Sequence, residues 1–209
     1  MTAPSTLDDQ LRRAVRLVAL LNLAYFGVEF AVALKIGSVS LFADSVDFLE
    51  DAAVNFLIFA ALGWSATRRA RVGMGLAGVL LIPAIAFLWM LWRKFEASAP
   101  PAALQLTLTG GGALAVNLLC AFTLARFRAH GGSLTKAAFL SARNDALANV
   151  GIIGAGALTA LTYSVWPDVI VGLGIAVMNL DAARAVWTAA RDEHSLAASG
   201  PSVEGASHR

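Results

Sequence analysis

Six apolar stretches dominate the chain, and each is close to the ~20 residues that an α-helix needs to span a bilayer. Charged residues make up only 14% of the sequence, whereas a soluble domain carries roughly 25%. We therefore expect residues 1–13 to be a cytoplasmic N-terminal segment, 14–189 a transmembrane domain, and 190–209 a short, disordered cytoplasmic tail. The pattern predicts an all-α polytopic membrane protein with six transmembrane helices, over residues 14–34, 39–64, 73–93, 104–126, 137–163 and 168–189.

Lysine and arginine are distributed unevenly between the breaks in these stretches. If both termini are inside, the outer segments carry only Lys35, Arg93 and Lys94. The asymmetry predicts cytoplasmic N and C termini. We expect a multi-pass protein of the cell inner (plasma) membrane. The inner segments carry Arg12, Arg13, Arg16, Arg68, Arg69, Arg71, Arg126, Arg128, Lys136, Arg184, Arg191 and Arg209.

The net charge of +2 is too small to indicate a nucleic-acid partner, and a single cysteine excludes a disulfide framework.

A polar stripe runs along the second stretch, in the segment "LFADSVDFLEDAAVN". At 100° per residue, Asp44, Asp47, Asp51 and Asn55 fall within about 80° of one another, with Glu50 at the edge. One ionised side chain at mid-bilayer costs about 2.5–3.5 kcal/mol, so a stripe of three aspartates cannot face lipid. It must face protein, water or a cation.

A matching acid lies in the fifth stretch. Asp47 is about 14 Å from the outer end of its helix, at 1.5 Å per residue, and Asp145 is at a similar depth on a helix of opposite direction. Ser141 lies one turn before Asp145, and Asn149 lies one turn after it. Two antiparallel helices can therefore bring Asp47, Asp51 and Asp145 together near the membrane midplane.

The polar pattern also repeats. "EDAAVN" at 50–55 and "NDALAN" at 144–149 share Asp-Ala-x-x-Asn, 94 positions apart. "NL" at Asn22 recurs at Asn117, 95 positions later. Two three-helix halves with such an offset have opposite orientations, because three is odd. The sequence therefore predicts two inverted three-helix halves with a site between them.

Oxygen ligands spaced i and i+4 on one helix, joined by others from an antiparallel helix, suit a divalent cation. Without metal, clustered acids in a low-dielectric site tend to hold protons, so metal and proton compete for the same oxygens. Glu50 either supports the metal ligands without binding the metal itself or forms an ion pair with Arg143. Four asparagines are candidates to hold the metal ligands in place, to line the transport pathway, or to form hydrogen bonds between helices: Asn22, Asn55, Asn144 and Asn149. Asp44 belongs to the same group of pathway candidates.

At these residues the chain resembles the cation diffusion facilitator family of divalent metal–proton exchangers. "GSVSLFADSVDFLEDAAVN" is similar to the family's second helix, where His or Asp is followed by Asp four residues later, at Asp47 and Asp51. "NLLCAFTLARFRAHGGSLTKAAFLSARNDALANVGII" is similar to its helices four and five, where the corresponding pair falls on Ser141 and Asp145. "YSVWPDVIVGLGIAVMNLDAARAVW" is similar to helix six, and Asp168 in it is expected to stabilise a helix N-terminus.

The resemblance implies a divalent metal efflux transporter, not an enzyme, with Asp47, Asp51, Asp145 and Ser141 as metal ligands and protons as counter-ion. Family prevalence puts Zn²⁺ first, whereas an all-oxygen set favours Mn²⁺, Fe²⁺ or Co²⁺. No fixed cofactor is expected. The family usually carries a cytoplasmic dimerising domain after helix six, which we expect to be absent because only 22 residues follow Trp187. A homodimer would then form through transmembrane helices.

Two alternatives from other classes stay open. A membrane-embedded, metal-dependent phosphotransferase of the CDP-alcohol type also uses several aspartates at helical spacing. Such an enzyme needs an Asp-Gly and an Ala-Arg pair beside them, but Asp47 is followed by Phe48. The second alternative is a transport-inactive partner subunit, for which Ser141 at a ligand position is the main argument.

Overall fold

The computed structural model describes residues 7–61, 85–96, 99–127 and 132–179, and every regular element within them is a helix. Four long helices are described: α1 (Leu7–Ile36), α2 (Val39–Ala61), α4 (Ala103–Ala125) and α5 (Gly132–Thr162). Residues 85–96 are also helical, as is the segment Trp166–Asn179. The all-α prediction is confirmed for the described residues. The six-span topology stays a prediction, because 62–84 and 180–209 lie outside them.

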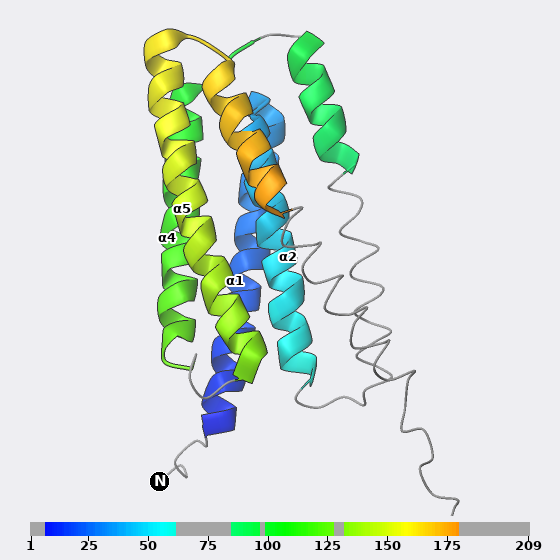
Figure 1. The fold of residues 1–209 in the computed structure, drawn as a ribbon, viewed down its shortest axis with the longest axis vertical. Coiled ribbons are helices and arrows are strands. Elements are labelled where there is room, and N and C mark those ends of the chain that lie inside the picture. The colour runs from blue at the N-terminus through cyan, green and yellow to red at the C-terminus, as the bar shows by residue number, and fades with distance from the viewer. Residues whose placement is uncertain (1–6, 62–84, 97–98, 128–131, 180–209) are drawn as a thin grey trace, which may run out of the picture. The chain divides into compact units, whose positions relative to one another are not determined.

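These four helices alternate in direction and pack in a ring, in the order α1, α2, α5 and α4 (Figure 1). The described residues up to Ile175 belong to one compact unit. We call the end where α1 begins the lower end, and the end where α1 stops the upper end (Figure 1). Because α2 and α5 are antiparallel neighbours, residues from the middle of each can meet, as the sequence predicts.

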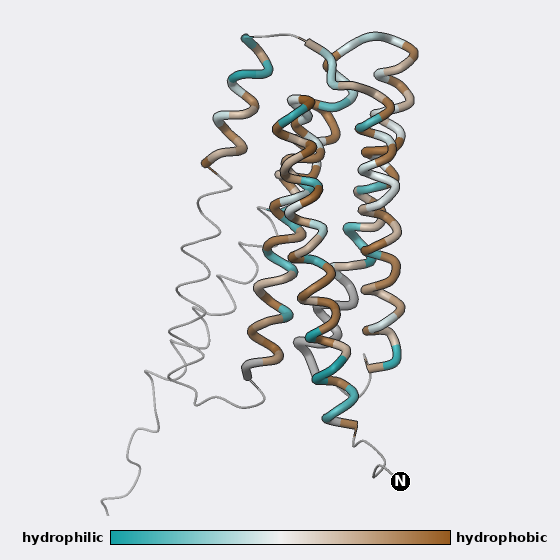
Figure 2. The backbone as a smooth tube through the Cα atoms, turned by 180° about the vertical axis from the view of Figure 1, so that it is seen from behind, coloured by the Kyte–Doolittle hydropathy of each residue, from teal (hydrophilic) through white to brown (hydrophobic). Residues whose placement is uncertain are grey.

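The surface of these helices is apolar. Hydrophobic positions predominate along the tube in Figure 2, and large side chains such as Phe122, Leu147 and Leu161 are exposed. Three of the described helices are long and apolar enough to cross a membrane: Asp9–Ile36, Ala103–Ala125 and Ser141–Thr162. Helix α2 equals α4 in length, at 23 residues, but its acids lower its hydropathy.

A glycine turn joins α1 to α2, at the expected break "KIGS". Gly37 has a φ of +65°, which is the left-handed conformation that glycine adopts without a steric cost. The Ser38 amide donates to the Ala33 carbonyl at 3.1 Å, which closes the helix end in a Schellman-type arrangement. This turn sets the antiparallel α1–α2 pair.

Asp168 holds the start of α2 from another helix. One of its carboxylate oxygens accepts from Ser38 Oγ and Ser40 Oγ, each at 2.6 Å, and the other accepts from the Val39 amide at 2.8 Å. Lys94 donates to the Gly37 carbonyl at 2.7 Å from the helical segment 85–96. The acid expected to stabilise a helix N-terminus therefore caps α2, in addition to its place in the first turn of its own helix.

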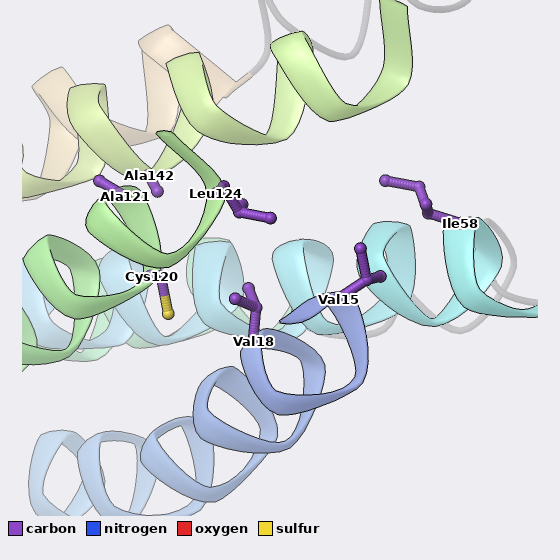
Figure 3. Packing of buried hydrophobic residues seen from close by; sticks show 7 residues of the cluster. All are labelled: Val15, Val18, Ile58, Cys120, Ala121, Leu124 and Ala142. Carbon is purple, nitrogen blue, oxygen red and sulfur yellow. The ribbon is translucent and has the colours of Figure 1, made fainter. Parts of the chain in front are cut away.

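Towards the lower end, an apolar cluster takes side chains from all four helices (Figure 3). Ile58 of α2 lies about two turns below Asp51, and Ala142 of α5 lies one turn before Asp145. Along α2 and α5, Ile58 and Ala142 therefore lie on the lower-end side of Asp51 and Asp145. The buried members of the cluster are Val15, Val18, Ile58, Cys120, Ala121, Leu124 and Ala142.

Gly172 lets its own helix pack closely against the start of α2, where Asp168 caps that helix. A substitution at Gly172 can test this contact. A Cβ at Gly172 would lie 2.8 Å from the Ser40 amide nitrogen and the Val39 carbonyl carbon, whereas a Cβ at Gly174 would meet nothing within 4 Å. We expect Gly172→Ala to lower the free energy of unfolding by about 1–3 kcal/mol through overpacking. Gly174→Ala, the matched control, should be neutral or stabilising by up to about 1 kcal/mol. Thermal unfolding in detergent measures both, and equal behaviour of the two variants would contradict the close contact.

Candidate metal site

The predicted ligands come together where the middles of α2 and α5 cross. Ser141 Oγ donates to Asp51 Oδ1 at 3.0 Å. The carboxyl groups of Asp51 and Asp145 are within hydrogen-bonding range of each other, and Asp47 interacts electrostatically with both. One turn of α2 separates Asp47 from Asp51, and one turn of α5 separates Ser141 from Asp145, so four side chains face a common region.

These side chains are largely shielded. Asp47 is 8% exposed, and Asp51, Asp145 and Ser141 are half-buried. Like charges this close together repel each other strongly in a low-dielectric interior. The arrangement therefore favours a bound cation or proton over three ionised aspartates alone.

As they stand, the aspartates are neighbours and not a closed coordination shell. Within the described part of the chain, no three His, Cys, Asp or Glu side chains converge closely enough to hold a metal ion. Asp51 Oδ1 accepts the hydrogen bond of the Ser141 hydroxyl, so a cation would have to compete with this hydrogen bond. The chemistry of the donors, carboxylates and one hydroxyl, fits a hard or borderline divalent cation.

A second polar layer lies above this group, towards the upper end. Asn149 Nδ2 donates to Asp44 Oδ2 at 2.6 Å, and Asn117 Nδ2 donates to Asn149 Oδ1 at 3.2 Å. Asp44 and Asn149 are fully buried, and Asn117 is nearly so. The structure thus links two of the predicted pathway residues, Asp44 and Asn149, directly to each other across α2 and α5.

Glu29 of α1 belongs to this layer and is absent from the candidates drawn from the sequence. Its side chain is fully buried, and its carboxyl group is within hydrogen-bonding range of that of Asp44. The available signal was a lone acid inside the first apolar stretch, in "VEFAVAL". An ionisable residue within a span is a functional candidate by default. However, Glu29 has no counterpart in the repeat and no second acid at helical spacing on its own helix. Neither of the two patterns that identified the other candidates therefore includes it.

The other candidates differ in their surroundings. Asn55 is buried and donates to the Asp51 backbone carbonyl at 2.8 Å, and buried Asn22 accepts from the Cys120 thiol at 3.5 Å. Glu50 is half-buried and interacts with Asp51 electrostatically. Asn144 is exposed, on the other side of α5 from the buried Asn149. In the described residues no ion pair joins Glu50 to Arg143, which is itself exposed.

Comparison with known proteins identifies the family. No curated protein matches the chain. A family model described as the cation efflux transmembrane domain matches residues 15–192, which is most of the sequence and nearly the whole expected transmembrane domain. Members of that family are transporters, so the phosphotransferase alternative is wrong. The chain therefore belongs to the cation efflux family, whose members are membrane proteins that transport divalent metal cations.

Proposed function

We propose that this protein exports a divalent metal cation from the cytoplasm across the cell inner membrane in exchange for protons. Asp47, Asp51 and Asp145 are the proposed direct ligands, with the Ser141 hydroxyl as a fourth. The observation that carries the proposal is the convergence of Ser141, Asp51 and Asp145 across α2 and α5, deep in an apolar bundle. A cluster of acids in such a place is stable only with positive charge bound to it.

The same oxygens bind protons and metal. In the empty state mutual repulsion leaves at least one proton shared among Asp47, Asp51 and Asp145. A metal ion needs ionised carboxylates, so its binding from the cytoplasm releases that proton. When the site faces outward, the higher proton activity there restores the proton and expels the metal.

Zn²⁺ is our first candidate for the cargo because of the family resemblance. The donor set itself contains only oxygen, which favours Mn²⁺, Fe²⁺ or Co²⁺ over zinc's usual His and Cys ligands. Family members are commonly dimeric, and we extend the proposal to a homodimer formed through transmembrane helices. The outward-facing apolar side chains of the bundle are compatible with either lipid or a second copy.

Alternating access would come from two inverted halves that exchange conformations. The predicted repeat pairs Asn22 with Asn117 and Asn55 with Asn149. In the second half Asn117 Nδ2 donates to Asn149 Oδ1, whereas in the first half Asn22 Nδ2 and Asn55 Oδ1 have no partner among the described residues. The hydrogen bond of one half is thus missing from the other, as expected if the two halves adopt different states at any moment.

Transport by the purified protein in liposomes tests this function. With metal added outside and the lumen made acidic, molecules inserted inside-out should accumulate metal in the lumen, and faster than without the pH gradient. An indicator trapped in the lumen measures the rate, and protein-free liposomes are the control. No accumulation of Zn²⁺, Mn²⁺, Fe²⁺ or Co²⁺ would favour the transport-inactive partner subunit. Accumulation that ignores the gradient would make the protein a uniporter.

A further inference from the structure

Glu29 and Asp44 form an acid pair apart from the proposed metal ligands. Both side chains are 0% exposed, and their carboxyl groups are within hydrogen-bonding range of each other. Asn149 supplies one hydrogen bond, to Asp44 Oδ2. Neither oxygen of Glu29 nor Oδ1 of Asp44 has a donor within the described residues.

Two facing carboxylates cannot satisfy this geometry alone. Ionised carboxylates are acceptors only, so a hydrogen bond between them exists only if one carries a proton. An orphaned buried charge is costly, and here two would face each other. The three donor-free oxygens therefore point to a positive charge between Glu29 and Asp44, and the smallest is a single proton.

The described surroundings of the pair add no positive charge that could replace that proton. On α1, the phenol of Tyr25 is nearby, but it donates its hydroxyl to the Thr109 carbonyl at 2.6 Å. On α2, Glu29 interacts with Asp47, and Asp44 with Asp51. On α5, Asp145 interacts with Asp44 as well. Each of these interactions with an acid is repulsive when both partners are ionised.

The pair lies between the metal ligands and the upper end of the bundle. Glu29 is about 10 Å below the end of α1 and Asp44 is about 8 Å below the start of α2, at 1.5 Å per residue. On the same scale Asp47 is about 12 Å deep and Asp51 is about 18 Å deep. In the proposed topology the upper end is outside, so protons entering from outside reach Glu29 and Asp44 first.

We propose that Glu29 and Asp44 share one proton and form a second proton-binding site, separate from the metal ligands, that empties when metal binds. This rests on the proposed exchange of metal for protons. The O–H bond breaks on metal binding, the proton leaves to water, and both carboxylates remain ionised. Metal at Asp47, Asp51 and Asp145 drives this step because its charge offsets the repulsion that kept the proton on the pair.

Charge balance supports two protons per metal ion. With one proton on the pair and one on the three aspartates, the five acids carry a net charge of about −3. With both protons gone and a divalent ion bound, the net charge is again about −3. The buried charge therefore does not change between the proton-loaded and the metal-loaded states.

Proton release on metal binding tests this site. Purified protein in weakly buffered detergent solution is titrated with Zn²⁺ or Mn²⁺ alone, with a pH indicator and a parallel measurement of bound metal. Wild type should release about two protons per metal ion, and Glu29→Gln about one, because the introduced amide donates a hydrogen bond to Asp44 and carries no proton to release. Glu96→Gln, which changes an exposed acid in the segment 85–96, should behave as wild type.

Further readouts separate this proposal from the proposed function. In wild type, infrared difference spectra should show that the band of a protonated carboxylic acid decreases when metal binds. This decrease should be smaller in Glu29→Gln and in Asp44→Asn, and it should be as large as in wild type in Glu29→Asp. Equal proton release by wild type and Glu29→Gln would overturn the second site while leaving the exchanger intact. No proton release by wild type would overturn the exchanger itself. Loss of a second bound metal ion in Glu29→Gln would make the pair a metal site and overturn its assignment to a proton.

Discussion

Asp51→Asn and Asp145→Asn should each abolish metal transport, with a loss of more than about 100-fold in the initial rate. Changes to the mere hydrogen-bonding partners of metal ligands already cost about 10- to 100-fold. Here a direct ligand would change from a carboxylate to a neutral amide, which removes one of the negative charges that balance the cation. The structure makes the two positions equivalent for this test, since their carboxyl groups are adjacent.

The variants should still fold. Asn can accept the Ser141 hydroxyl as Asp51 does, and the loss of one buried carboxylate relieves repulsion with its neighbours. The protein in the membrane is quantified by immunoblot beside transport in liposomes. Arg143→Gln is the matched control, because it removes a charge two residues from Asp145 at an exposed position and should keep normal transport. Near-normal rates for either aspartate variant would remove the site assignment.

That the proposed ligands lie near one another was predictable, because their spacing follows the periodicity of an α-helix. Asp47 and Asp51 share a face of α2 whatever the tertiary structure, and depth alone matched them to Asp145 on a helix of opposite direction. The turn at Gly37 was also predictable, since a glycine between two apolar stretches marks a helix end. Local rules of this kind carry over to the folded protein without knowledge of which helices are neighbours.

Contacts between helices were the part that sequence could not supply. The pairing of Glu29 with Asp44 depends on the rotation of α1 about its axis, which neither repeat nor spacing specifies. Asp168 was recognised as a residue of a helix N-terminus, but it also caps α2, 128 positions before it in the chain. The exposure of Asn144 beside buried Ala146 follows likewise from the crossing of α5 with α2 and α4.

Ser141→His should shift metal preference towards zinc, by about tenfold or more in the ratio of Zn²⁺ to Mn²⁺ affinity. Imidazole nitrogen is among zinc's preferred ligands, whereas manganese prefers oxygen. Position 141 is the right place for this test because its side chain already reaches the carboxylate of Asp51 from the neighbouring helix. A tenfold change corresponds to about 1.4 kcal/mol, which is no larger than the effect of removing a group that only hydrogen-bonds to a metal ligand.

Ser141→Ala is the control that distinguishes direct binding of the metal by residue 141 from a role in orienting Asp51. It removes the hydroxyl without offering a nitrogen, so it frees Asp51 Oδ1 from its 3.0 Å hydrogen bond and adds no new donor to the metal. If Ser141 only orients Asp51, both Ser141→Ala and Ser141→His should weaken the binding of Zn²⁺ and Mn²⁺ to the same extent. The ratio of the two affinities would then stay unchanged. If position 141 faces the metal, His alone should move the ratio. Competition binding of Zn²⁺ against Mn²⁺ to each purified variant decides between the two. An unchanged ratio in Ser141→His would limit the ligand set to Asp47, Asp51 and Asp145, with water completing the shell.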